Sequence, residues 1–221
     1  MRRIVKGSEP EDLRHWKEEN VETPQNLIYS NMPKVEVKLQ MLVEQGYLCA
    51  YTMQRIPTID DCHIEHIVPR NQNPLLQIDY VNLLACVPSD TPGHRPLGGK
   101  YPFGAQKKDR TNIDDSSFVS PTQEDVEQRF QYDPYGNVAA LNGDGAAKNT
   151  IAVLGLDHDQ LVELRKAAID ERVLDIDLSP EGAVNLSSTI MSADAAGRIP
   201  EFCSAISQVA LWYANKLRNL G

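Results

Sequence analysis

Residues 63–66 form the densest group of side chains in the chain that can bind a metal or move a proton. The sequence there is His63-Ile64-Glu65-His66, and Pro69 follows shortly after. A carboxylate binds hard cations such as Mg²⁺, and a neutral imidazole accepts a proton near pH 7. Hydrolysis of a phosphodiester uses both, because the cation neutralises charge on the phosphate and the base activates the attacking water. The group therefore indicates metal-assisted hydrolysis.

A plainer interpretation of this group also fits the composition. The chain has five histidines in 221 residues, so a pair three positions apart can arise by chance. The group would then be a buried, hydrogen-bonded polar strand. Neighbouring side chains on a strand point to opposite faces. Glu65 and His66 can therefore serve one site only if the strand ends there, just before Pro69.

Short β-prone segments around this group predict the elements that position it. Residues 47–52 and 62–68 are separated by Pro57, and we expect them to pair as a hairpin. An apolar segment, residues 80–86, follows a polar loop. Residues 87–110 are rich in Pro, Gly and Lys and predict a long loop, a type of segment that often carries function.

Helical patterns occupy most of the remaining chain. Ser8 is expected to cap a helix that runs to about Asn20, and spaced apolar residues predict another over 35–46. A second hairpin is expected over 129–141, and later helices are expected to open at Asp157, Ser179 and Ile199. We expect an α+β chain with three parts: an N-terminal helical segment (1–46), a small core (47–112) and a hairpin with helices (113–221).

Charge is distributed unevenly. The net charge is −9, which argues against a general nucleic-acid coat. Residues 111–221 carry 17 acidic and 8 basic side chains, whereas the stretch 94–110 is basic. The four cysteines include no C-x-x-C pair, and no long apolar run or signal peptide is present. We therefore expect a cytoplasmic protein without disulfides or membrane contact.

Further residues at set spacings strengthen the functional interpretation. Asn82-Leu83-Leu84 begins 16 residues after His66, Cys49-x-Tyr51 begins 17 before it, and the segment 103–109 contains two lysines. In these features the sequence resembles the HNH nucleases. It resembles in particular the HNH subunit of Septu-type anti-phage defence systems, which is found beside an ABC/SMC-like ATPase and also in retron operons. The resemblance covers most of the chain.

This resemblance implies a ββα-metal (HNH) core in the part 47–112, embedded in a mainly helical chain. It implies that His66 is the general base and Glu65 a ligand of Mg²⁺ or another divalent cation. Asn82 would either orient the loop between the strands or join the metal ligands. The third ligand stays open, with Asp109, His94 and Asp90 as the candidates.

Supporting residues follow from the same resemblance. Nucleic-acid contacts are expected from Arg70, Lys100, Lys107, Lys108 and Arg110, with Lys107 matching the lysine of the terminal motif. His63, Cys49 and Cys86 are expected to be structural. Met53 and Phe103 stand where the family has further cysteines, so we expect a small hydrophobic core in place of a structural zinc.

The resemblance also implies partners. The substrate is expected to be DNA or RNA, tRNA included. The ATPase is expected to bind the acidic half of the chain, and a retron reverse transcriptase with its msDNA is a further candidate partner. The alternative is an HNH scaffold without catalysis that docks the ATPase.

Overall fold

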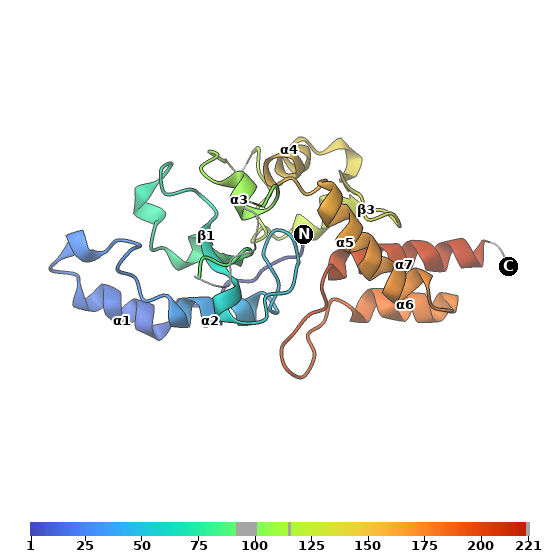
Figure 1. Cartoon of the computed structure of the whole chain (residues 1–221), viewed down its shortest axis with the longest axis horizontal. Coiled ribbons are helices and arrows are strands. Elements are labelled where there is room, and N and C mark those ends of the chain that lie inside the picture. The colour runs from blue at the N-terminus through green and yellow to red at the C-terminus, as the bar shows by residue number, and fades with distance from the viewer. Residues whose placement is uncertain (92–100, 115, 220–221) are drawn as a thin grey trace.

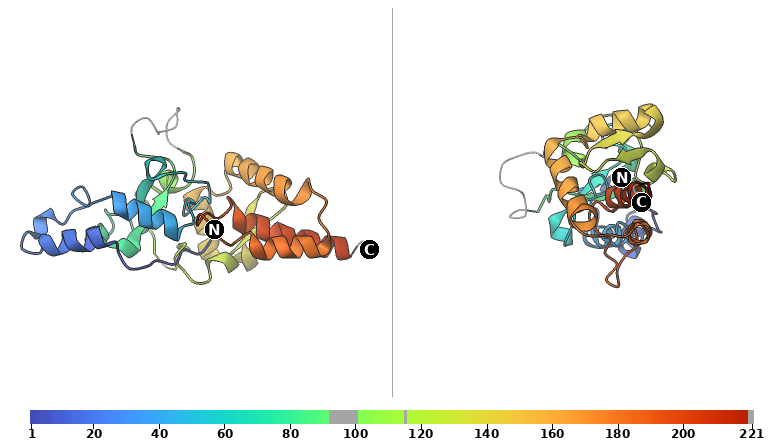
Figure 2. Two further views of the ribbon diagram at one scale, coloured as in Figure 1. Left: turned by 90° about the horizontal axis from the view of Figure 1, so that it is seen from below. Right: turned by 90° about the vertical axis from the view of Figure 1, so that its right-hand side faces the viewer.

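The computed structural model describes residues 1–91, 101–114 and 116–219, which form an α+β fold (Figure 1). The helices are α1 (Glu11–Glu19), α2 (Val35–Glu44), α3 (Ala105–Lys108), α4 (Gly145–Leu154), α5 (Asp159–Ile169), α6 (Pro180–Thr189) and α7 (Cys203–Arg218). The strands are β1 (His63–His66), β2 (Leu83–Cys86), β3 (Phe130–Tyr132) and β4 (Val138–Ala140). The molecule is elongated, with α1 near one end and the end of α7 at the other (Figures 1 and 2).

The first sheet pairs β1 with β2 in antiparallel register, with His66 opposite Leu83 and His63 opposite Cys86. The predicted pairing of 62–68 with 47–52 is therefore wrong. Residues 47–55 form tight turns instead, in which Tyr47 and Met53 take positive φ angles of 60° and 61°. The 47–52 segment reaches β2 rather than β1, because the Ala50 N–H donates to the Ala85 carbonyl at 3.1 Å.

A buried glutamine completes this edge of β2. The Gln45 side chain accepts from the Ala85 N–H and donates to the Ala85 carbonyl, both at 2.8 Å. An amide side chain at the end of α2 thus takes the place of a neighbouring strand. This satisfies backbone groups that would otherwise be buried without partners.

The second hairpin is confirmed. β3 and β4 pair antiparallel with Phe130 opposite Ala140, and a turn that starts at Asp133 joins them. Asp133 stabilises this turn, because its carboxylate accepts from the N–H groups of Tyr135 and Asn137 at 2.9 Å each.

Helix starts were predicted with mixed success. Ser179 caps α6 as expected and accepts from the Gly182 N–H at 3.0 Å. α1 begins after Pro10 without a side-chain cap, so the predicted role of Ser8 is wrong. α5 is capped by His158 rather than Asp157. α7 begins at Cys203, because Phe202 takes a left-handed conformation and donates its N–H to the Met53 carbonyl.

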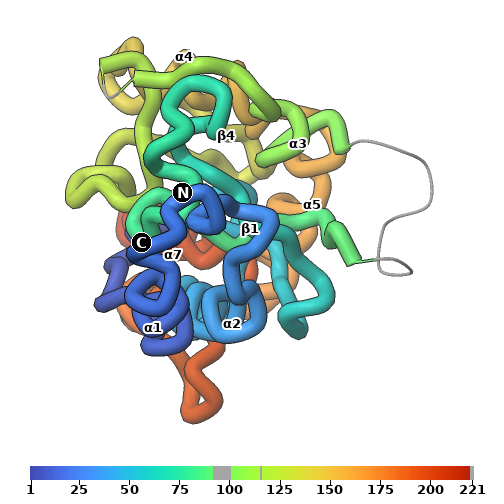
Figure 3. The backbone as a smooth tube through the Cα atoms, turned by 90° about the vertical axis from the view of Figure 1, so that its left-hand side faces the viewer, coloured from blue at the N-terminus to red at the C-terminus, as the bar shows by residue number. Residues whose placement is uncertain are grey.

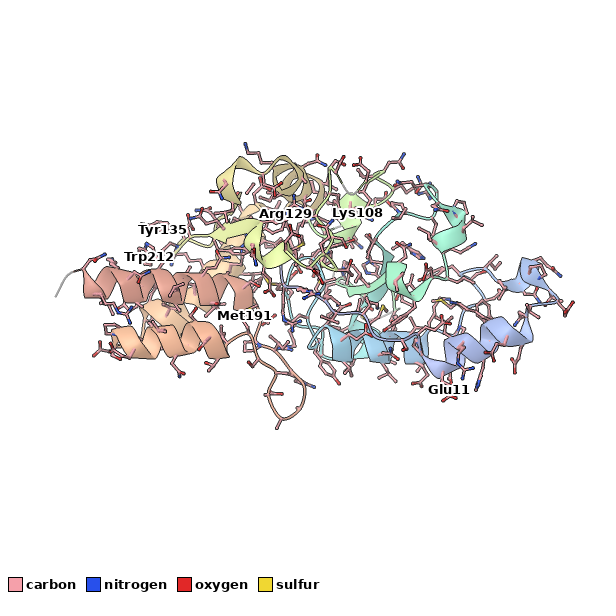
Figure 4. All side chains as sticks on the ribbon, turned by 180° about the vertical axis from the view of Figure 1, so that it is seen from behind. Glu11, Lys108, Arg129, Tyr135, Met191 and Trp212 are labelled. Carbon is pink, nitrogen blue, oxygen red and sulfur yellow. The ribbon has the colours of Figure 1, made fainter. Side chains whose placement is uncertain are left out.

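One hydrophobic core extends through the chain and crosses both predicted part boundaries. The N-terminal residues contact the C-terminal part of the chain, where the Ile4 N–H donates to the Pro121 carbonyl at 2.8 Å. Viewed from the α1 end, α1 and α2 lie on one side of β1 and α4 on the opposite side (Figure 3). Trp212, in the second half of α7, is 44% exposed (Figure 4).

Within the described ranges, no helix is both long and apolar enough to cross a membrane.

Candidate active site

A cleft of about 870 Å³ opens beside β1. Its walls come from β1, the loop after it, the segment after β2, and α3 with the residues that follow. Seven residues singled out from the sequence as site residues line it: His63, Glu65, His66, Arg70, Asp90, Asp109 and Arg110. The cleft therefore brings together side chains that are up to 47 positions apart in the sequence.

β1 ends at His66, as the functional interpretation required. Along the strand, exposure alternates: His63 and Glu65 are half-buried, and Ile64 and His66 are buried. Because the strand stops before Pro69, Glu65 and His66 both line the cleft even though they are neighbours.

The His66 imidazole is held in one orientation. Its Nε2 lies 3.0 Å from the Gln77 carbonyl oxygen. A carbonyl only accepts, so Nε2 carries the hydrogen and Nδ1 keeps a lone pair. The Tyr29 ring packs edge-on against the imidazole, with centroids 4.9 Å apart. Burial lowers the pKa of His66 to about 4, so the ring is neutral near pH 7.

Glu65 is tied to the short helix α3. Its Oε1 accepts from Lys108 Nζ at 2.7 Å, and the same ammonium donates to the His66 carbonyl at 2.8 Å. Burial raises the pKa of Glu65, and the nearby ammonium opposes that rise. The pair joins β1 to α3 directly below the cleft.

Lys108 is therefore not placed to bind phosphate. Its side chain is fully buried, and it lies inside the body of the molecule (Figure 4). The predicted nucleic-acid contact is wrong for this residue, because both of its polar partners are internal. Lys107 is exposed, but it packs against Gly155 at the end of α4 and does not line the cleft. Lys100 lies outside the described residues.

His63 faces Glu65 across the cleft wall. Its Nδ1 lies 2.6 Å from the Pro88 carbonyl oxygen, and its Nε2 lies 4.0 Å from Glu65 Oε2. The ring is therefore oriented by the segment that follows β2. Residues i and i+2 of a strand share one face, which explains why these two side chains meet.

Asn82 is a structural brace, and its place among the metal ligands stays a prediction. Its Oδ1 accepts from the Val68 N–H at 2.8 Å, and its Nδ2 donates to the carbonyls of Val68 and Leu76. The residue is only 5% exposed, and it is not among those that line the cleft. Of the two roles left open by the sequence, it performs the first: it holds the loop between β1 and β2.

The candidates for a third ligand differ in position. Asp109 lines the cleft after α3, and Asp90 lines it while paired with Lys38 at 3.2 Å. His94 lies outside the described residues. Among the residues described, no three His, Cys, Asp or Glu side chains gather closely enough to form a complete protein-only metal site.

Cys49 and Cys86 lie in the core, where their thiols hydrogen-bond to each other. All four cysteines are free thiols. Met53 and Phe103, which stand at the two other expected cysteine positions, are 3% and 1% exposed and belong to the same hydrophobic core. The structural role predicted for Cys49 and Cys86 is consistent with this packing.

Tyr29 was missed by the sequence reasoning. It comes from the segment between α1 and α2, and it lines the cleft. Its ring lies under the Arg70 guanidinium at 4.6 Å and near the Lys34 ammonium at 4.9 Å. A lone aromatic residue in a polar stretch carries no local signal of such a role. Tyr29 thus contacts both the His66 ring and the Arg70 guanidinium at the rim of the cleft.

No protein-family model and no curated protein sequence matches this chain. The functional argument therefore depends on the geometry of the cleft.

Proposed function

We propose that the chain is a metal-dependent nuclease of the HNH (ββα-metal) class that hydrolyses phosphodiester bonds in DNA or RNA. The observation that carries the proposal is the pairing of a neutral, oriented His66 with Glu65 at the end of β1, in one cleft. The order of the surrounding elements supports it: two antiparallel strands, β1 and β2, are followed by the short helix α3 beside the same cleft.

His66 is suited to act as the general base. Gln77 holds the Nε2 hydrogen, which leaves the Nδ1 lone pair to accept a proton from the attacking water. The pKa of about 4 keeps this nitrogen unprotonated at neutral pH. Tyr29 prevents the ring from rotating, so the base stays in position for a bound phosphodiester.

The residues present fit a divalent cation that retains water ligands. One oxygen of Glu65 is engaged by Lys108, and the other, Oε2, faces His63 within the cleft wall. Few protein ligands are needed where water completes the coordination, as for Mg²⁺. When bound, the cation supplies positive charge that stabilises the phosphate and the leaving oxygen.

Two arginines at the cleft are placed to contact the substrate backbone. Arg70 and Arg110 both line the cleft, and Arg70 stacks on Tyr29. Guanidinium groups bind phosphates in a forked geometry. Such contacts position a strand without reading its sequence, so target choice belongs to other surfaces or partners.

The resemblance described above extends this proposal to a biological setting. The chain would be the effector subunit of an anti-phage complex with an ABC/SMC-like ATPase, with a retron reverse transcriptase and its msDNA as a further partner. The acidic half of the chain would bind a basic surface of the ATPase.

A second candidate function is a binding module without catalysis. Two observations favour it: Lys108 already neutralises Glu65, and the described residues contain no complete three-ligand site. The chain would then retain the cleft as a scaffold that binds the ATPase or nucleic acid.

A cleavage assay separates the two. The purified chain, alone and with its partner ATPase, is incubated with total tRNA and with plasmid DNA, with divalent cation or EDTA. We expect cation-dependent cleavage that falls by about 10²–10⁴-fold in His66→Ala, the usual contribution of a general base. His15→Ala is the matched control, because His15 is exposed on α1. A stable complex that cuts neither substrate under any condition would favour the binding module.

A further inference from the structure

The two oxygens of Glu65 have different surroundings. Oε1 accepts from Lys108, whose side chain is completely buried and also bonded to the His66 carbonyl. Oε2 points to the other side and lies 4.0 Å from His63 Nε2. Lys108 therefore leaves one carboxylate oxygen to face the cleft in a fixed direction.

His63 presents a lone pair to that oxygen. Its Nδ1 is 2.6 Å from the Pro88 carbonyl, which can only accept, so Nδ1 carries the hydrogen of the neutral ring. Nε2 then holds the lone pair and faces Oε2 at a distance too long for a hydrogen bond. The 4.0 Å gap between these two atoms can be bridged by a positively charged group, either a proton on Nε2 or a bound cation.

We propose that His63 Nε2 and Glu65 Oε2 together bind one divalent transition-metal cation. Metal–ligand bonds measure about 2.0–2.1 Å to histidine nitrogen and about 2.0–2.2 Å to carboxylate oxygen. The 4.0 Å separation is within the sum of two such bonds, so one cation between the two atoms contacts both. This assignment rests on the proposed function. It adds His63 to Glu65 as a second protein ligand, and it specifies which class of metal the site prefers.

The ligand pair predicts the class of cation. Imidazole nitrogen suits transition metals such as Fe²⁺, Ni²⁺ and Zn²⁺, and a carboxylate also suits Mn²⁺, whereas Mg²⁺ prefers oxygen ligands throughout and keeps its water. A site with one nitrogen and one carboxylate oxygen therefore selects a transition metal over Mg²⁺. The backbone carbonyl of Pro88 fixes the ring, which is the usual way a ligating histidine is oriented.

Direct Mn²⁺ titration tests the site without any nuclease assay. Free Mn²⁺ is followed by electron paramagnetic resonance as it is added to the full chain. We expect one Mn²⁺ per chain, displaced by Mg²⁺ only at much higher concentration. His63→Ala and the ring-preserving His63→Phe are both expected to weaken Mn²⁺ binding by more than about tenfold.

Control variants make the result specific. Glu65→Gln is expected to weaken Mn²⁺ binding as His63→Ala does, whereas His15→Ala on α1 is expected to bind as the unaltered chain does. Circular dichroism melts identify any variant that fails to fold. Unchanged Mn²⁺ affinity in folded His63→Ala and His63→Phe would overturn the assignment, as would a folded unaltered chain that does not bind Mn²⁺.

Failure of this assignment can be told apart from failure of the proposed function. Mn²⁺ binding that requires His63, in a chain that cuts no nucleic acid, would support the metal site and contradict the nuclease. Cation-dependent cleavage that requires His66, with Mn²⁺ affinity indifferent to His63, would support the nuclease and overturn this ligand pair.

Discussion

At the scale of single residues, the site depends on backbone carbonyls that orient its imidazoles. Gln77 takes the Nε2 hydrogen of His66, and Pro88 takes the Nδ1 hydrogen of His63. The two rings therefore present different nitrogens, Nδ1 in one and Nε2 in the other. This difference is the one that the proposed roles need, with a proton acceptor at His66 and a cation ligand at His63.

The buried His66 makes stability depend on pH. Its pKa is about 4 in the folded chain, below the ordinary value of about 6.5, so the unfolded chain binds the proton first as the pH falls. The neutral, buried His66 makes its full contribution to the free energy of unfolding above about pH 6.5. As the pH falls toward 4, the free energy of unfolding decreases by up to about 3 kcal/mol because this contribution is lost. We expect this slope in chemical denaturation from pH 7 to pH 4 in EDTA.

His66→Gln provides the control for this slope, because glutamine does not titrate and can still donate to the Gln77 carbonyl. The difference in unfolding free energy between the two proteins is expected to change across this pH window. A difference that stays constant from pH 7 to pH 4 would show that His66 is not buried in its neutral form.

Asn82 offers a second test at this scale. Its amide satisfies the Val68 N–H and two loop carbonyls, so Asn82→Ala is expected to cost about 1–3 kcal/mol of unfolding free energy. Urea denaturation measures this cost. Mn²⁺ affinity of the folded variant, measured at low temperature, is expected to stay unchanged. A specific loss of cation binding at unchanged stability would place Asn82 among the metal ligands.

At the scale of elements, the Lys108–Glu65 pair connects α3 to β1. α3 has four residues and is too short to be stable alone, so this ion pair and the burial of Ala105 hold it against the strand. We expect Lys108→Met to lower the unfolding free energy by about 3–5 kcal/mol, because it leaves a carboxylate buried without its partner. Thermal and urea denaturation measure the loss.

The double variant Lys108→Met with Glu65→Gln separates charge from packing. Removal of both charges is expected to restore much of the stability lost in Lys108→Met, since buried ion pairs are often replaceable by neutral side chains. If the double variant is as unstable as the sum of the two single variants, the pair contributes by packing rather than by neutralising a buried charge.

Elements with local signals were the predictable part of the fold. The second hairpin needs only the Asp133 turn, and α6 needs only the Ser179 cap, so both were predicted correctly. The partner of β1 was wrong because the pairing spans the whole 67–82 loop, and no local pattern specifies such a contact. The cap of α5 was wrong by one residue, since Asp157 and His158 both suit the position.

The residues of the site likewise divide into those with a local sequence signal and those without one. Glu65 and His66 were predictable because they are neighbours in a motif of distinctive composition. Tyr29, the Gln77 carbonyl and the buried position of Lys108 were not, because each comes from another segment that folding brings to β1. Residue type alone also could not separate Lys107 from Lys108, although one is exposed and the other is fully buried.

At the scale of the whole molecule, the two halves of the chain share one core. The first residues reach the C-terminal half: the Met1 amine donates to the Tyr132 hydroxyl, and Ile4 pairs with Pro121. In the other direction, the Ile199 N–H donates to the Gly46 carbonyl at 3.0 Å, and Arg55 donates to the Ile199 carbonyl. The acidic C-terminal half therefore packs against the half that carries the cleft.

This architecture decides how the acidic half can be tested as a docking surface. A chain truncated after residue 112 would lose the core side chains from Ile113 to Ala210, and with them much of the apolar burial that stabilises the fold. We expect the truncated chain to lack a cooperative melt and to show poor dispersion of amide signals in NMR spectra. Loss of ATPase binding after truncation would then report unfolding rather than a lost interface, so charge-reversal variants of exposed acidic residues are the informative test. A cooperative melt of residues 1–112 would show instead that the N-terminal half has a core of its own, and truncation would become a valid measure of docking.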